Sequence, residues 1–204
     1  MDTTLSPTKG NLIIAKNTLA LSRQGYELLD KKRNLLIREM MELIGVAKSI
    51  QAKIDETFRE AYVALQKVNI IVGIEEVKDI GHAIPLEESI TVRFRSVMGV
   101  EIPLVSASLE DNTPQYGFFR TGSSLDEAVM KFKKVKELTI DLAQIENSVY
   151  RLAKNIKKTQ KRANALKNST IPKYEELVKF IQNSLEEKER EEFTRLKVIK
   201  KQKM

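Results

Sequence analysis

The sequence has no cysteine and no tryptophan, and only one of its 204 residues is a histidine. Without cysteine the chain can form neither disulfides nor thiolate metal sites, and it lacks a cysteine nucleophile. The single histidine, His82, excludes histidine pairs and zinc sites built from several histidines. We interpret His82 as a loop residue, and we expect no catalytic residues, no metal and no cofactor. The lack of disulfides is typical of a reducing compartment, which favours a cytoplasmic protein.

Glycine and proline are scarce, with 8 and 5 residues, and most of them lie in a central window from Gly73 to Gly122. The two flanks are therefore almost free of helix breakers. No stretch approaches the roughly 18 uninterrupted apolar residues of a membrane span, so we expect a soluble chain or one held at a membrane through partners. Gly117–Ser124 has the glycine spacing of a phosphate-binding loop, but Ser123 replaces its essential lysine. We expect no nucleotide site there.

Apolar residues recur every 3.5 positions along the first flank. A helix is predicted to start at Ser6, Pro7 and Thr8, with Ser6 as the N-cap and proline in the first helical position. From Leu12 onward, 15 of the 18 heptad seam positions are apolar. The seam positions are Leu12, Ala15, Leu19, Ser22, Tyr26, Leu29, Arg33, Leu36, Met40, Leu43, Ala47, Ile50, Ile54, Thr57, Ala61, Ala64, Val68 and Ile71. A repeat kept this long predicts a left-handed coiled coil with a partner helix.

The second flank carries the same repeat and is the natural partner. Nine of its 11 seam positions between Val135 and Thr170 are apolar. Pro172 lacks a backbone N–H, so we expect it to bend or interrupt the helix after Thr170. Beyond it the apolar spacing changes, which predicts a local unwinding of the supercoil. The 11 seam positions are Val135, Leu138, Leu142, Ile145, Val149, Leu152, Ile156, Thr159, Ala163, Leu166 and Thr170. The apolar positions beyond Pro172 are Tyr174, Leu177, Ile181 and Leu185.

The central window holds a β-hairpin signal. Apolar and polar residues alternate over residues 90–95 and again over 100–104, with a turn near Met98 and Gly99. Because two strands alone are marginally stable in water, the hairpin should pack against the end of the helical rod or another protein. We therefore predict an all-α fold, a long antiparallel two-helix coiled-coil hairpin with a short central β-hairpin insertion. Its segments are 1–72 as the N-terminal helix, 73–124 as the link and 125–204 as the C-terminal helix, together one elongated unit.

Positive charge is unevenly distributed. The chain has 35 Lys plus Arg against 28 Asp plus Glu, and residues 151–167 contain seven bases and no acid. Folding the arms together would place this stretch opposite residues 30–43, whose only acids are Asp30, Glu39 and Glu42. A solvated helix face is one interpretation, and a surface that meets an acidic partner is the one we favour. This basic collar comprises Arg151, Lys154, Lys157, Lys158 and Lys161.

Four stretches in the two arms carry a family resemblance that covers essentially the whole chain. They are Ser6–Thr8, Leu28–Arg33, Arg162–Leu166 followed by Ile171 and Pro172, and Glu189–Lys197. In this order they resemble the signature stretches of the D-subunit, the central rotor shaft of the V-type and archaeal A-type rotary ATPases. Asn34 and Lys167 stand where the family usually has acidic residues, so salt bridges that the family forms at those two sites are not expected in this chain.

The resemblance implies a torque-transmitting subunit rather than an enzyme. It implies three partners, namely the catalytic A/B-type hexamer, the small companion of the central stalk known as the F-subunit, and a socket subunit on the membrane ring. It also implies a cytoplasmic location, peripheral to the membrane through the complex. The hexamer-facing contacts implied are Lys16, Arg23, Arg162, Arg190 and Arg195. The alternative is a basic coiled-coil scaffold or a module that binds nucleic acid or anionic surfaces. The lack of an aromatic stacking platform argues against nucleic-acid binding.

Overall fold

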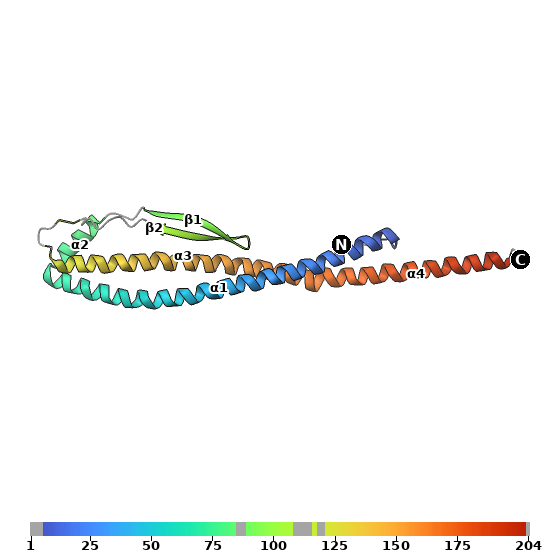
Figure 1. The fold of residues 1–204 in the computed structure, drawn as a ribbon, viewed down its shortest axis with the longest axis horizontal. Coiled ribbons are helices and arrows are strands. Elements are labelled where there is room, and N and C mark those ends of the chain that lie inside the picture. The colour runs from blue at the N-terminus through green and yellow to red at the C-terminus, as the bar shows by residue number, and fades with distance from the viewer. Residues whose placement is uncertain (1–5, 85–88, 108–115, 118–120, 203–204) are drawn as a thin grey trace. The chain divides into compact units, whose positions relative to one another are not determined.

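The computed structural model describes residues 6–84, 89–107, 116–117 and 121–202. Long helices dominate it, and a two-stranded antiparallel sheet interrupts them (Figure 1). In chain order the elements are α1 (Lys9–Ile71), α2 (Ile74–Ala83), β1 (Ile90–Val97), β2 (Val100–Ala107), α3 (Ser123–Ala165), a π-helix (Leu166–Thr170) and α4 (Ile171–Gln202). The predicted all-α fold with a β-hairpin insertion is confirmed.

Contacts between residues group the chain into two compact units. One comprises residues 1–35 with 156–204, and the other comprises residues 36–155. In the first unit, three pairs join α1 to the C-terminal half of the chain. They are Arg33 with Gln160 at 2.8 Å, Arg23 with Glu175 at 2.6 Å, and Lys9 with Glu189 at 3.1 Å. Because the partner number rises as the α1 number falls, the helices of this unit run antiparallel.

The second unit shows the same direction of pairing. Tyr62 of α1 meets Phe132 of α3 edge to face, with ring centroids 5.8 Å apart. Closer to the ends of these helices, Ala64 and Val68 of α1 form a buried cluster with Leu125 and Ala128 of α3. Small residues at this cluster let the two backbones approach closely.

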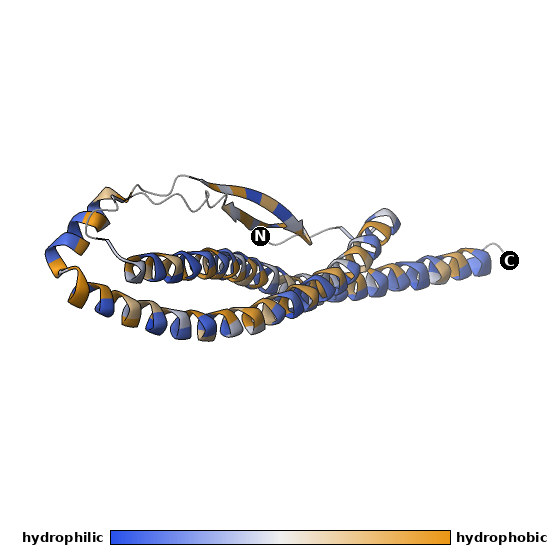
Figure 2. Cartoon of the chain, turned by 60° about the vertical axis from the view of Figure 1, so that its left-hand side comes forward, coloured by the Kyte–Doolittle hydropathy of each residue, from blue (hydrophilic) through white to orange (hydrophobic). Residues whose placement is uncertain are grey.

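The helical seam follows the predicted heptad. Every predicted seam position of the first flank is buried or half-buried, with Ile71 as the exception at 68% exposed. Every predicted seam position from Val135 to Leu185 is likewise buried or half-buried. Leu36, Leu152 and Ile181 are completely buried, and each such side chain stabilises the folded chain by roughly 1.5–3 kcal/mol. Hydrophobic and hydrophilic bands alternate along these helices in Figure 2.

The start of α1 differs from the sequence prediction. The cap is Thr8, whose side-chain oxygen accepts the backbone N–H of Asn11 at 3.3 Å. Ser6 lies outside the helix, where its carbonyl accepts the Asn11 side-chain amide at 2.8 Å. The helix therefore starts two residues later than the Ser6 cap implied, because Thr8 stands three residues before a free N–H.

The effect of Pro172 also differs from the prediction. The α-helical pattern stops at Ala165 instead of Thr170, and a five-residue π-helix from Leu166 to Thr170 leads into α4. The backbone N–H of Ile171 reaches the carbonyl of Leu166, five residues back. Pro172 is then in the first turn of α4, where a missing N–H costs little. The change from α-helical to π-helical hydrogen bonding therefore lies before the proline, and the helix continues after it.

The hairpin has the predicted strands and turn. Val97 pairs with Val100 across a two-residue loop in which Met98 and Gly99 have φ values of 51° and 73°. Positive φ at both loop residues is the geometry whose twist matches a two-stranded ribbon. The hairpin lies along the side of α3 and not at a helix end, since the backbone N–H of Val105 donates to Gln144 at 2.6 Å (Figure 1). The prediction that it packs at the end of the rod was wrong.

Candidate partner-binding surfaces

The five residues expected to face a hexamer all belong to the first unit and are exposed. Arg23 pairs with Glu175, and both side chains remain about half exposed. Such exposed pairs contribute about 0–1 kcal/mol, so a partner can displace this one at small cost. Among the described residues, Lys16 and Arg162 form no ion pair. The five side chains lie along the helices and do not converge on one point.

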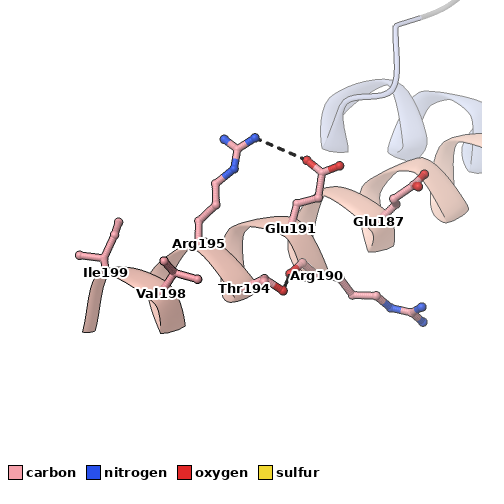
Figure 3. A pocket seen from close by; sticks show the side chains of 7 residues that line it. All are labelled: Glu187, Arg190, Glu191, Thr194, Arg195, Val198 and Ile199. Atoms are coloured by element: carbon pink, nitrogen blue, oxygen red, sulfur yellow. Dashed lines mark hydrogen bonds and ion pairs between the residues drawn. The ribbon is translucent and has the colours of Figure 1, made fainter. Parts of the chain in front are cut away.

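Arg190 and Arg195 border a shallow hollow on α4 (Figure 3). Arg195 pairs with Glu191 at 3.7 Å, and the Thr194 hydroxyl donates to the Arg190 carbonyl at 2.8 Å. All residues that line the hollow come from this one helix, so it is a helix surface and not an enclosed ligand site. The lining residues are Glu187, Arg190, Glu191, Thr194, Arg195, Val198 and Ile199.

Among the described residues of its unit, this part of α4 meets the start of α1 only near its own beginning, where Glu189 pairs with Lys9 and Lys188 reaches the carbonyl of Pro7. Every residue from Glu186 to Gln202 is exposed, including Phe193 at 66% and Leu196 at 65%. Large apolar side chains exposed in a row on a helix are typical of a surface that another protein covers.

Four members of the basic collar share one face of α3. Lys154, Lys157, Lys158 and Lys161 follow the i, i+3, i+4, i+7 spacing that places side chains on one side of a helix, and all four are exposed. The buried residue Thr159 lies on the opposite side. Among the described residues, none of the four lysines forms an ion pair.

The acids expected opposite the collar are largely engaged elsewhere. Asp30 pairs with Arg33 at 2.6 Å in the first unit. Glu39 pairs with Arg95 of the hairpin at 3.6 Å in the second unit. These two acids already have a base each, so they are not available to pair with the four lysines.

Arg151 is the exception in the collar. Its side chain is half-buried, and its guanidinium donates to the carbonyl of Glu101 at 3.3 Å. The same group lies over the ring of Phe94, 5.0 Å from the centroid. Arg151 therefore holds the hairpin on α3 and is not part of a surface free for a partner. No pattern in the sequence signals this role, since Arg151 is one more base in a basic run.

An apolar patch that the sequence analysis missed lies where α1 meets α2 in the second unit. Ile70, Ile71 and Ile74 are 84%, 68% and 69% exposed, and this turn appears as a hydrophobic segment in Figure 2. Gly73 makes the turn possible with a φ of 104°, a conformation that other residues rarely adopt. A tract of Ile70, Ile71, Val72 and Ile74 around one glycine was the available signal. The predicted seam had assigned Ile71 to the buried face.

Tyr116 and Asp126 tie the region before α3 to its first turn. The phenol hydroxyl of Tyr116 donates to the carboxylate of Asp126. Burial, this hydrogen bond and the nearby negative charge together raise the pKa of Tyr116 from 10.0 to about 12.

Neither metal-binding clusters nor nucleotide loops are apparent in the described residues. Within residues 6–84, 89–107, 116–117 and 121–202, no three His, Asp or Glu side chains form a group that could hold a metal. Part of Gly117–Ser124, with its phosphate-loop spacing, lies outside these ranges, and Ser123 begins α3. His82 lies in the last turn of α2 and not in a loop as predicted. None of the described helices is long and apolar enough to cross a membrane.

Comparison with known proteins gives full-length matches. Residues 11–201 match the family model described as the ATP synthase D-subunit. The V-type ATP synthase D-subunit of Thermotoga neapolitana is 46% identical over 196 residues, which are 96% of this chain and 97% of that protein. The A-type ATP synthase D-subunits of Pyrococcus abyssi and Pyrococcus furiosus are 36% and 37% identical over 199 residues, covering 96% of this chain and 93% of each relative.

Proposed function

The chain belongs to the ATP synthase D-subunit family, and on that basis we propose that it is the central rotor shaft of a V-type or A-type rotary ATPase. In this proposal it transmits torque between a nucleotide-binding hexamer and a membrane ring, during ATP synthesis or ATP-driven ion transport. It is a non-catalytic, cytoplasmic subunit, peripheral to the membrane through its complex. The observation that carries the proposal is the long apolar seam, buried between antiparallel helices within each unit.

The mechanical argument starts from that seam. Helix backbone hydrogen bonds are internal, and interdigitated seam residues cannot slide without losing their contacts. A paired rod of this kind resists twist better than a single helix. A rotating shaft biases which catalytic interface of the hexamer closes, because it contacts each interface differently in each orientation.

The exposed half of α4 supports insertion into the hexamer. Its residues from Glu186 to Gln202 are all exposed, and they include Arg190 and Arg195. Together with Lys16, Arg23 and Arg162, these bases are the proposed hexamer contacts. The isoleucines at the turn between α1 and α2 support a second contact, with a socket subunit on the membrane ring, because an exposed apolar patch favours a protein partner.

The basic collar supports docking of an acidic partner, which we assign to the companion F-subunit or to the hexamer rim. The alternative, a module for nucleic acid or anionic surfaces, is also favoured by the four exposed lysines Lys154, Lys157, Lys158 and Lys161, which form no ion pair with a described residue. Measuring DNA binding at several salt concentrations distinguishes the two functions. A true DNA binder loses affinity steeply and log-linearly with salt, whereas the shaft should show no saturable DNA binding at physiological salt.

Removal of residues 193–204 tests the shaft assignment. These residues lie beyond the seam, so the shortened chain should keep its fold and lose helix signal only in proportion to the residues removed. Reconstituted with the other subunits, it should show weakened assembly, or ATP hydrolysis uncoupled from ion transport. Removal of residues 201–204 alone is the matched control and should behave as the full chain. Full coupled activity without residues 193–204 would contradict the proposed insertion of this end.

A further inference from the structure

No strand of the described residues pairs with the outer edge of β1, and this edge carries large apolar side chains. In the second unit β2 is the strand that packs on α3, because Val100 and Ile102 are buried and the backbone N–H of Val105 donates to the side chain of Gln144 on α3. All residues of β1 up to Ser96 are exposed, including Ile90 at 44%, Val92 at 52% and Phe94 at 56%. A strand with three exposed large apolar residues is the kind of edge on which another strand pairs.

The register shows which backbone groups point outward. Val105 donates its N–H to Gln144, and Glu101 offers its carbonyl to Arg151, so both residues face away from the β1–β2 ladder. Their partners are Val92 and Ser96. In an antiparallel pair such residues alternate with those that bond inward, so Ile90, Val92, Phe94 and Ser96 present N–H and C=O groups on the outer edge. Among the described residues, none of these four backbones accepts or donates a bond outside the ladder.

The charges on β1 select the partner. Arg93 and Arg95 alternate with the apolar residues and lie on the other face of the strand. Arg95 is paired with Glu39, while Arg93 is exposed and has no ion pair with any described residue. In an antiparallel pairing of two copies through β1 that is centred on Arg93 or Phe94, Arg93 lies opposite Arg93 or Arg95 of the second copy, and like charges in that position are destabilising. The arginines thus disfavour self-pairing and favour an acidic strand.

We propose that the outer edge of β1 is a β-augmentation site for an extended segment of a partner protein, with apolar side chains on one face and acidic side chains on the other. The segment extends the two-stranded sheet to three strands. Its backbone bonds to the outward groups of Val92, Phe94 and Ser96. Its apolar residues lie beside Val92 and Phe94, and an acidic residue lies beside Arg93. This goes beyond the shaft function, which requires no strand pairing.

Amide exchange on the full chain tests the proposal with two synthetic probes. The first is a capped nine-residue peptide of alternating valine and glutamate, and the second replaces each glutamate by lysine. With saturating acidic peptide, exchange of the Val92, Phe94 and Ser96 amides measured by NMR should slow at least tenfold, while the basic peptide should leave it unchanged. No slowing, or equal slowing by both peptides, would overturn the proposal. Dimerisation of the free chain through β1 would overturn it as well.

Two matched variants locate the contact. Val92→Pro removes an outward N–H without removing a bond of the ladder, and Val92→Ala keeps that N–H while shortening the side chain. The proline variant should bind the acidic peptide at least tenfold more weakly than the alanine variant, and equal affinity would contradict the proposal. If the proline variant loses protection of its Arg93 amide, the hairpin has melted. The wild-type chain is then tested with an acidic peptide that is N-methylated at alternate residues on the bonding edge, and unchanged binding of that peptide overturns the proposal.

Discussion

At the scale of single residues, Arg151 and Lys154 differ far more than their sequence context suggests. Both are bases in the same run, yet Arg151 contacts Glu101 and Phe94 while Lys154 is exposed. Arg151→Ala should lower the free energy of unfolding by about 1 kcal/mol, because one charged hydrogen bond and one cation–π contact are lost at a partly exposed site. It should also speed amide exchange at Val105. Urea unfolding and NMR exchange measure both effects.

Lys154→Ala is the control for this experiment. It removes a base from the same helix without removing a contact of the hairpin, so stability should change by less than about 0.5 kcal/mol. An equal effect of the two variants would mean that Arg151 does not hold the hairpin.

Tyr116 makes stability depend on pH in the alkaline range. Its pKa is raised to about 12 in the folded chain, against 10.0 for the unfolded group. Between these values the unfolded chain loses the proton first, so the stabilisation present below pH 10 is lost as the pH rises toward 12. Tyr116→Phe should flatten this part of the stability curve, measured by urea unfolding at several pH values. An unchanged slope between pH 10 and 12 would contradict the raised pKa.

Asp126→Asn separates the causes of that shift. It removes the carboxylate charge but not the burial, so absorbance titration should place the Tyr116 pKa between 10 and 12. A pKa still near 12 would mean that the carboxylate charge contributes nothing to the shift, because the Asn side-chain oxygen can still accept the hydrogen bond.

At the scale of elements, a leucine contributes strongly to the free energy of unfolding only where it lies in the buried seam. Leu36 is completely buried, whereas Leu28 on the same helix is 67% exposed. Leu36→Ala should cost about 2–5 kcal/mol through lost burial and the cavity that it leaves. Leu28→Ala should stay within about 0.5 kcal/mol. Urea unfolding followed by circular dichroism measures both, and similar costs for the two variants would argue against the heptad assignment.

The same seam explains how much of the fold was predictable. A heptad repeat is a local pattern, so the buried faces of α1, α3 and α4 could be derived from the sequence, and so could the hairpin turn at Met98 and Gly99. The place where the hairpin packs could not, because it depends on long-range contacts such as that of Val105 with Gln144. The π-helix was also missed, since a proline indicates a disturbed helix without saying on which side the bonding changes.

The candidate surfaces were predictable only in part. The run of bases indicated a collar, but which bases remain free followed from pairs such as Glu39 with Arg95. The exposed isoleucines at the turn between α1 and α2 were assigned to the seam as far as Ile71. A periodic pattern does not show where a helix pair ends.

At the scale of the whole molecule, the collar should serve assembly more than folding. Changing Lys154, Lys157, Lys158 and Lys161 to Glu keeps like charges among the four positions but turns the repulsion from Arg151, three residues before 154, and from Arg162, four residues after 158, into attraction. Helix content and melting temperature should therefore be unchanged or higher. Association with the partner subunits, followed by stopped-flow fluorescence, should become slower and less dependent on salt.

The matched control changes the same four lysines to Gln. This variant removes the positive charge without reversing it, so its association rate should fall between those of the wild type and the Glu variant. If the Glu variant unfolds while its remaining folded fraction associates at the wild-type rate, the collar is structural.

The exposed end of α4 also has a consequence for the lifetime of the chain. An isolated helix of this length is marginal in water, so in the free chain Glu186–Gln202 opens more readily than the paired helices. Proteases act on segments that open, so a copy that fails to find its complex is expected to be cut first at this end. The surface proposed to enter the hexamer would then also mark surplus copies for removal, which keeps the amount of shaft matched to the number of assembled machines.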